Sequence, residues 1–221
     1  MKPLELWRPP DGAGAAIGCV ATTFTFDADF FSQDCLAQFL GLTAAYGEGG
    51  RASDFSLMIE EEERLAEATV TVLVDRGGYN AQARNLRWDL LPVAVPGGLL
   101  HAKSAVLLWE HSLRFIIGSA NLTPAGYRRQ VEMVSGYDIG QGSTDLPLTI
   151  AEALLEEISR IANDLVPIQM SGPRKRVLRT LDMARQRIRQ ADLTPSVPVG
   201  ARFAVAAVRN RLSALDGFDA V

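Results

Sequence analysis

The 221-residue sequence contains few cysteines and histidines, with two residues of each type. The two cysteines, Cys19 and Cys35, exclude the disulfide framework of small secreted domains and argue against a zinc site built on cysteine. With only His101 and His111, a mechanism that needs two histidines must use both or take one from elsewhere. The sequence also lacks any run of about 18 or more apolar residues, so we expect no membrane-spanning helix.

The N-terminal region does not have the apolar core of a secretory signal, because Glu5, Arg8 and Asp11 interrupt residues 1–18. We therefore expect a soluble, cytoplasmic protein. Hydrophobic residues make up 48% of the chain and charged residues 22%, a composition typical of globular proteins. The length suits one large domain, or a core domain with an appendage.

Acidic residues are scarce in one part of the chain. Residues 1–173 hold 12 Lys and Arg against 22 Asp and Glu, whereas residues 174–212 hold 10 against 2. A basic segment on an acidic body suggests an anionic partner such as nucleic acid. The alternative is a solvated helix face whose cations pair with the acidic body, and both interpretations stay open.

Apolar and β-branched runs predict strands mixed with helices over one core, which indicates an α/β or α+β fold. Strands are predicted over 16–25, 54–59, 69–75, 90–95, 104–109, 113–117 and 131–138. Helices are predicted over 28–41, 148–165, 174–191 and 201–215, and the acidic run Glu60–Glu63 is predicted to start another. We expect residues 1–165 to form the compact unit and residues 166–221 to form a basic helical tail or a linker between two halves.

The most informative stretch joins His101 and Lys103 to Gly118, Ser119 and Asn121 through two apolar runs that predict a β-hairpin. In a strand, residues i and i+2 project from the same face, so an imidazole and an ammonium would lie side by side. The returning strand would bring Ser119 and Asn121 beside that pair. This set suits a phosphate, because Lys103 and Asn121 can hold its oxygens while His101 attacks phosphorus. Gly118 would let the backbone approach the anion closely.

These residues resemble the signature of the phospholipase D superfamily, in which an H-x-K motif is followed by a hairpin and then by G-S-x-N. The resemblance continues in Gln130-Val131-Glu132 and is closest over residues 100–135. It implies a phospholipase D-like α/β fold, with a mixed sheet flanked by helices, of which this chain holds one H-x-K half. It also implies a phosphodiesterase that works through a phosphohistidine on His101, with no metal ion or other cofactor.

The same resemblance assigns a role to each residue of the motif. Catalytic roles fall to His101, Lys103, Asn121 and Glu132. Phosphate binding falls to Lys103, Gly118, Ser119 and Asn121. Glu132 would hydrogen-bond the far ring nitrogen of His101, which fixes the tautomer and raises the nucleophilicity of the imidazole.

One position departs from the family pattern, which usually has an aspartate five residues after the lysine, where this sequence has Leu108. The tyrosyl-DNA phosphodiesterase branch also lacks that aspartate and has a similar apolar hairpin with a glutamate at its tip, here Glu110. Gly118-Ser119 and Glu132 instead follow the broader family. The aspartate is not the reacting group, so its loss does not argue against catalysis. His111 lies at the hairpin tip with no lysine two residues later, so we expect no catalytic role for it.

The family mechanism uses two H-x-K motifs, whereas this chain has one. Three explanations remain open: a homodimer that brings two copies of His101 together, a chain that is the first half of a longer duplicated enzyme, or an inactive relic. Residues 174–212 would bind nucleic acid, mediate dimerisation or link two halves.

Two classes of function compete. The first is a metal-independent phosphodiesterase that acts on nucleic acid, and the second is a catalytically incomplete binding or assembly module with the same fold. Phospholipid cleavage is a third possibility, disfavoured because no amphipathic membrane-insertion segment is evident. The intact set of four catalytic residues favours the enzyme.

Overall fold

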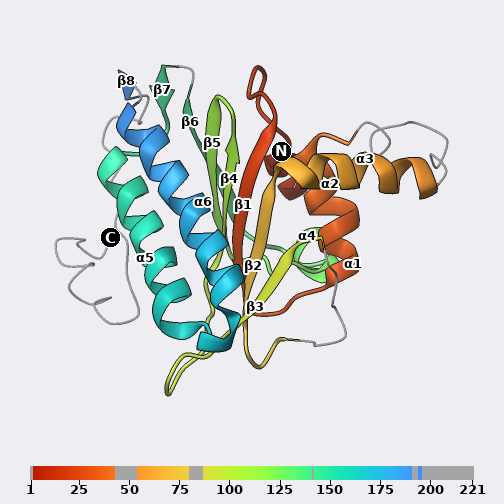
Figure 1. Cartoon of the computed structure of the whole chain (residues 1–221), viewed down its shortest axis with the longest axis vertical. Coiled ribbons are helices and arrows are strands. Elements are labelled where there is room, and N and C mark those ends of the chain that lie inside the picture. Colours follow the sequence, from red (N-terminus) through yellow and green to blue (C-terminus); the bar gives the residue numbers. More distant parts are fainter. Residues whose placement is uncertain (1, 43–53, 80–86, 141, 191–193, 196–221) are drawn as a thin grey trace.

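The computed structural model describes residues 2–42, 54–79, 87–140, 142–190 and 194–195. Its centre is a mixed sheet of eight strands in the order β3-β2-β1-β4-β5-β6-β7-β8 (Figure 1). The strands are β1 (Ala16–Thr23), β2 (Thr69–Asp75), β3 (Asp89–Val93), β4 (Lys103–Trp109), β5 (Ser112–Gly118), β6 (Val134–Gly140), β7 (Ser143–Thr144) and β8 (Thr194–Pro195). β1, β2 and β3 are parallel, whereas β4 is antiparallel to both β1 and β5. The ends of β1, β2, β3 and β5 therefore lie at the same edge of the sheet as the starts of β4 and β6.

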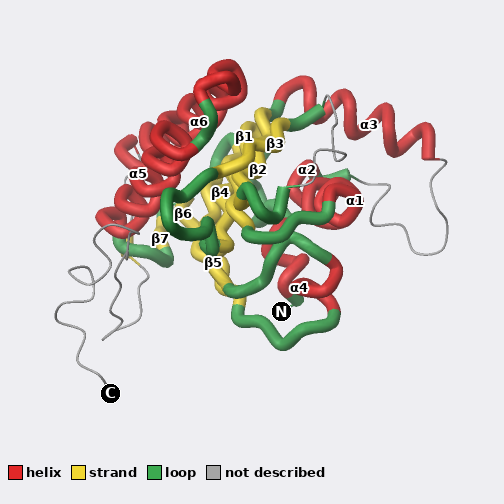
Figure 2. The backbone as a smooth tube through the Cα atoms, turned by 90° about the horizontal axis from the view of Figure 1, so that it is seen from below, coloured by secondary structure: helices red, strands yellow, loops and turns green. Residues whose placement is uncertain are grey.

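Helices cover both faces of the sheet, as Figure 2 shows, and the expected α/β fold is confirmed. One face carries α1 (Ala28–Phe30), α2 (Ala37–Leu40), α3 (Asp54–Glu67) and α4 (Pro124–Arg128), with a π-helical segment over Phe31–Leu36 and a 3-10 turn over Pro3–Trp7. The other face carries α5 (Leu148–Leu165) and α6 (Ser171–Gln190), with a 3-10 turn over Ile168–Met170 between them. Within the described ranges, no helix combines the length and the hydropathy that a membrane crossing needs.

The central strand β4 is apolar on both sides because each side meets a helical layer. Ala105, Leu107 and Trp109 pack in the core under α1–α4, and Val106 and Leu108 pack in the core under α5 and α6. This alternation follows from the two-residue period of a strand. A strand buried on both faces reads as a continuous apolar run, which is why the hairpin was visible in the sequence.

Helix α6 belongs to this second core, although its sequence is basic. Val177, Leu181, Ala184 and Ile188 are buried against the sheet and α5. The helix lies so close that a side chain at Gly18 in β1 would place its Cβ 2.5 Å from Thr180. The compact unit therefore extends to Gln190, beyond the boundary expected near residue 165, and the helix expected over 201–215 lies outside the described residues.

The structure differs from two other sequence-based expectations. Residues 54–59, expected as a strand, form the first part of α3, so the acidic run Glu60–Glu63 lies within that helix rather than at its start. Gly172-Pro173 was expected to precede the basic helix, yet both residues lie in the first turn of α6. A proline is tolerated there because the first amide groups of a helix have no intrahelical acceptor.

Candidate active site

The two halves of the motif meet at one edge of the sheet because the hairpin returns on itself. β4 begins at Lys103 and β5 ends at Gly118, and these two residues are direct partners across the strands. Gly118 is in turn paired with Val134, the first residue of β6. The predicted hairpin is confirmed, with Glu110-His111 as the turn at the opposite edge.

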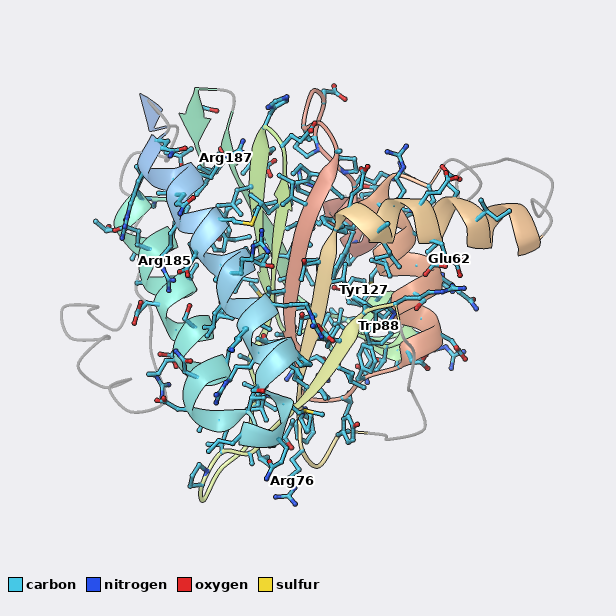
Figure 3. The ribbon with its side chains drawn as sticks, viewed as in Figure 1. Glu62, Arg76, Trp88, Tyr127, Arg185 and Arg187 are labelled. Atoms are coloured by element: carbon cyan, nitrogen blue, oxygen red, sulfur yellow. The ribbon has the colours of Figure 1, made fainter. Side chains whose placement is uncertain are left out.

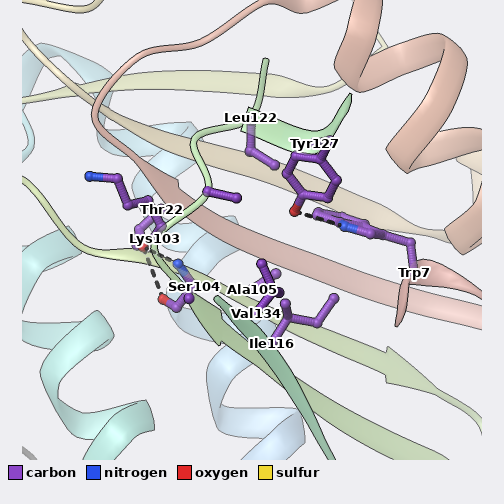
Figure 4. Close-up of a pocket in the computed structure, with 11 residues that line it drawn as sticks. Trp7, Thr22, Lys103, Ser104, Ala105, Ile116, Leu122, Tyr127 and Val134 are labelled. Atoms are coloured by element: carbon purple, nitrogen blue, oxygen red, sulfur yellow. Dashed lines mark hydrogen bonds between the residues drawn. The ribbon is translucent and has the colours of Figure 1, made fainter. Parts of the chain in front are cut away.

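Lys103 is the buried cation of this edge, with 9% of its surface exposed. Its Nζ donates a hydrogen bond of 2.9 Å to the backbone oxygen of His101 and lies 5.8 Å from the centre of the Phe24 ring. In Figure 4 its amino group points away from Trp7 and Tyr127, which line a small pocket behind it. Burial lowers the pKa of the Lys103 ammonium, and the carboxylate of Glu132 opposes part of that shift.

His101 lies just before β4 and is exposed, so its ring can meet a substrate. One side of the ring contacts Phe24, with 5.4 Å between the ring centres. Beside His101, a groove of about 330 Å³ runs between the sheet and α5, and Ile117, Leu154 and Glu157 are among the residues that line it. The imidazole therefore stands between a supporting aromatic ring and an open, mostly apolar groove.

Asn121 ties the segment after β1 to the segment after β5. Its Oδ1 accepts hydrogen bonds from the backbone amides of Phe24 and Thr25, both at 3.2 Å, and from the Thr23 hydroxyl at 3.3 Å. These three donors fix the side-chain amide, so the Nδ2 group is the part that remains to donate to a ligand. Through Phe24, the structure brings His101, Lys103 and Asn121 together.

Glu132 and Ser119 pair with each other. The Ser119 hydroxyl donates to Glu132 Oε2 and also accepts from the backbone amide of Met133 at 3.0 Å. The expected hydrogen bond, in which Glu132 accepts from the His101 ring, is not formed among the described residues. Instead, Glu132 acts on the motif through its charge, which favours the protonated form of Lys103.

A steric requirement also explains the glycine at position 118, in addition to its expected role in anion binding. A Cβ at this position would lie 2.5 Å from the backbone oxygen of Met133 and 3.0 Å from the Cα of Val134. Such distances are too short for a side chain, so the close approach of the segment before β6 requires glycine. The same approach places Glu132 beside Ser119.

The residues that depart from the family pattern lie away from this edge. Leu108 is buried in the core under α5 and α6. At the hairpin tip, Glu110 accepts a hydrogen bond of 2.9 Å from the backbone amide of Ala15, and the backbone amide of His111 donates to the oxygen of Ala13 at 2.8 Å. The tip therefore anchors the N-terminal segment and lies one full strand length from His101.

Sequence reasoning missed the residues that support the motif from β1 and β2. Phe24 contacts both His101 and Lys103, and Asp75 binds the backbone amide of Leu100, the residue before His101. The only sequence signal is position, because Phe24 directly follows β1 and Asp75 is the last residue of β2, and both strands end at the edge where β4 begins. Identifying them requires the strand order, which places β1 next to β4 and β2 next to β1.

The basic residues of α6 divide into paired and unpaired groups. Arg176 binds Asp89 through two hydrogen bonds of 2.7 Å, and Arg185 lies between α5 and α6 (Figure 3), where it binds Asp182 and Glu156. Lys175 and Arg179 have no acidic partner within the part of the chain that the structure describes. Charge pairing with the acidic body thus explains some of the basic run, but among the described residues it does not account for Lys175 and Arg179.

No family model matches the chain, and no curated protein matches it. Among solved structures, it is similar to a mutant of the yeast tyrosyl-DNA phosphodiesterase, with 15% identity and a TM-score of 0.43, over 79% of this chain and 36% of that one. It is also similar to NucT from Helicobacter pylori, with 12% identity and a TM-score of 0.40, over 70% of this chain and 84% of that one. The chain thus spans about a third of the length of the yeast protein. At this level of similarity the comparisons assign no activity to the chain.

Proposed function

We propose that this chain is one half of a phospholipase D-type phosphodiesterase that acts on nucleic acid and uses His101 as its nucleophile. The observation that supports the proposal is the meeting of His101, Lys103 and Asn121 around Phe24 at one edge of the sheet. An exposed imidazole, a buried ammonium and a fixed side-chain amide form a site for a phosphate with a nucleophile beside it.

The proposed reaction has two steps. A ring nitrogen of His101 attacks phosphorus, and the bond from phosphorus to the leaving ester oxygen breaks while a second histidine gives that oxygen a proton. The second histidine then takes a proton from water, whose oxygen displaces His101 from the phosphohistidine. Lys103 and the Nδ2 group of Asn121 hold the non-bridging oxygens and stabilise the negative charge in both steps.

The first test is turnover without metal. The purified chain is expected to cleave a single-stranded DNA oligonucleotide in EDTA, because a histidine nucleophile with lysine as its positive charge needs no divalent ion. The described residues contain no cluster of three or more His, Cys, Asp or Glu side chains placed to hold a metal ion. Activity that disappears in EDTA and returns with Mg²⁺ would contradict the mechanism.

We propose that the second histidine is His101 of a second copy, in a dimer whose two-fold axis passes the site. Three large apolar side chains are exposed around this edge: Val131 with 105%, Met133 with 83% and Leu99 with 58% of its surface accessible. Val131 and Met133 flank Glu132, and Leu99 precedes His101 by two residues. A second half seated over the site would bury these side chains and complete it in the same step.

Mixing subunits tests the dimer. Because each dimer would hold one site with two essential histidines, an equal mixture of wild-type and His101→Ala chains is expected to keep about one quarter of the activity of the same total amount of wild type. Chains that work alone would keep about one half. Activity is measured after the mixture has exchanged subunits, and a linear loss from a protein that is monomeric in solution would contradict the dimer.

A matched pair of surface variants locates the interface. Met133→Glu is expected to shift the protein toward monomer, measured as mass in solution, because it would bury a charge beside Glu132. Ile59→Glu places the same charge at another exposed apolar position, on α3, where 44% of the surface is accessible, and is expected to leave the dimer intact. If the two variants have the same mass in solution, the edge that carries the site is not the dimer interface.

The substrate is proposed to be nucleic acid because cations extend from the site toward α6. Arg76, exposed in the turn after β2, lies at the lower end of the molecule in Figure 3, where α6 also begins. Arg174, Lys175 and Arg179 follow in the first turns of that helix, and the last two have no acidic partner in the described ranges. A row of cations beside a phosphate site would follow a charged backbone.

The pH dependence tests the link between Glu132 and Lys103. Burial lowers the pKa of Lys103 from that of an ordinary lysine, so the catalytic charge is expected to be lost at a lower alkaline pH than in an exposed lysine. Glu132 opposes this shift, and Glu132→Gln is expected to move the alkaline limb of the kcat profile to still lower pH. An unchanged limb would mean that the Glu132 carboxylate does not act through the charge of Lys103.

The alternative is a non-catalytic module with the same fold. One observation favours it: in the single chain Glu132 binds Ser119, and one N–H of the Lys103 ammonium donates to the His101 backbone oxygen. A phosphate would have to use the other two N–H groups of Lys103 or displace this contact. A chain that binds oligonucleotide but gives neither turnover nor a covalent phosphoryl adduct would support the module.

A further inference from the structure

The turn that ends β2 lies at the same edge as the motif and contains a buried carboxylate. Asp75 is 3% exposed, and its two oxygens have different partners. Oδ1 accepts from the backbone amide of Gly77 at 2.8 Å, which closes the turn. Oδ2 accepts from the backbone amide of Leu100 at 2.6 Å, which joins this turn to the segment immediately before His101.

The same turn also supports the other side of the imidazole. A Cβ at Gly78 would lie 1.9 Å from the backbone oxygen of Phe24, so the turn packs directly on the segment after β1. The Phe24 ring contacts His101, and the backbone amides of Phe24 and Thr25 donate to Asn121. Residues 75–78 thus hold His101 from behind through Leu100 and from the side through Phe24.

We infer that Asp75 is the positioning residue for His101. The inference rests on the proposed function for its catalytic meaning, whereas the contact itself is a property of the fold. Leu100 is 3% exposed. Within the described residues, the Asp75 carboxylate is the acceptor that holds its backbone amide. A buried carboxylate that accepts a short hydrogen bond from a backbone amide holds that peptide strongly, and the next residue carries the imidazole.

Asp75→Asn tests the inference with little change of shape. The new amide group must face one of two backbone donors, so at least one of the two hydrogen bonds is lost. Amide exchange at Leu100 is expected to rise, and kcat is expected to fall by up to about 100-fold with little change in KM, because a small displacement of a reacting group costs rate more than binding. Asp138→Asn is the matched control, since Asp138 binds Arg114 four residues along β6 from the site edge and should change stability without this effect.

The two histidines provide a readout that does not depend on activity. In a histidine-labelled chain, the ring signals of His101 are expected to shift in Asp75→Asn while those of His111, at the other edge, stay unchanged. Gly78→Ala is expected to give the same pattern by displacing Phe24, whereas Gly98→Ala adds a methyl group 3.3 Å from the partly exposed side chain of Val95 and should leave both signals unchanged. If the wild-type chain has no turnover, the proposed function fails while the shift of His101 still tests the positioning.

Two results would overturn the inference. The first is an Asp75→Asn chain with wild-type His101 signals, Leu100 exchange and kcat. The second is a chain in which both histidines change together, which would make Asp75 a general stabiliser. If neither variant folds, the wild-type chain still tests the contact. The Leu100 amide must exchange more slowly than the amides of Gly97 and Leu99, two exposed residues of the same connection, and equal rates would contradict the hydrogen bond.

Discussion

Replacing His101 with alanine is expected to abolish turnover of a phosphodiester, lowering kcat by about 10⁴-fold or more, as the loss of a covalent nucleophile does in other enzymes. The ring is exposed, supported on one side by Phe24, and adjacent to the Lys103 ammonium through the His101 backbone. No other described imidazole lies at this edge, because His111 is in the hairpin turn at the far end of β4. The wild-type chain should therefore form one phosphohistidine, at residue 101, trapped by a quench that avoids acid and located by mass spectrometry.

His111→Ala is the matched control for this experiment. It removes the other imidazole of the chain from an exposed turn whose backbone, rather than ring, contacts Ala13. We expect both the adduct and kcat to remain at wild-type levels. An adduct on residue 111, or turnover that survives in His101→Ala, would show that the site has been placed at the wrong end of the hairpin.

The strands that carry the motif could be predicted because a strand that is buried on both faces has a continuous run of apolar residues in its sequence. β2 and α5 begin and end at the residues expected from sequence, and the hairpin of β4 and β5 was evident from its two apolar runs. The motif residues fall at strand ends, where polar side chains interrupt these runs. The sequence thus contains both the scaffold of the site and the residues that it presents.

What could not be predicted depends on neighbours that are distant in the chain. Asp75 meets Leu100 only because β2 and the connection before β4 end at the same edge. The basic sequence of α6 suggested a tail, yet Val177 and Leu181 bury one face of that helix against the sheet. Glu132 was expected at His101 but binds Ser119, because the short segment before β6 lies directly on Gly118. In each case the contact depends on tertiary packing, and the local sequence alone does not distinguish between the possible partners.

Replacing Lys103 with methionine is expected to lower kcat by about 10²–10³-fold, the cost of removing one preorganised donor from a charged transition state. Methionine keeps an unbranched apolar stem, which can still fill the space in front of the small pocket lined by Trp7 and Tyr127. The lost charge, rather than a cavity, would then account for the effect. Lys103→Ala is expected to be equally slow but less stable, because it also removes the stem.

Stability and activity should move in opposite directions in Lys103→Met. The pKa of Lys103 is lowered by burial, so the folded chain binds this proton less tightly than the unfolded chain does. At neutral pH the charged side chain therefore opposes folding, and its stability cost shrinks as the pH rises through the lowered pKa toward that of an ordinary lysine. An uncharged methionine avoids that cost, so Tm at pH 7 is expected to hold or rise while kcat falls. A variant with a lower Tm and unchanged kcat would identify Lys103 as a structural residue and leave the proposed phosphate site without its fixed positive charge.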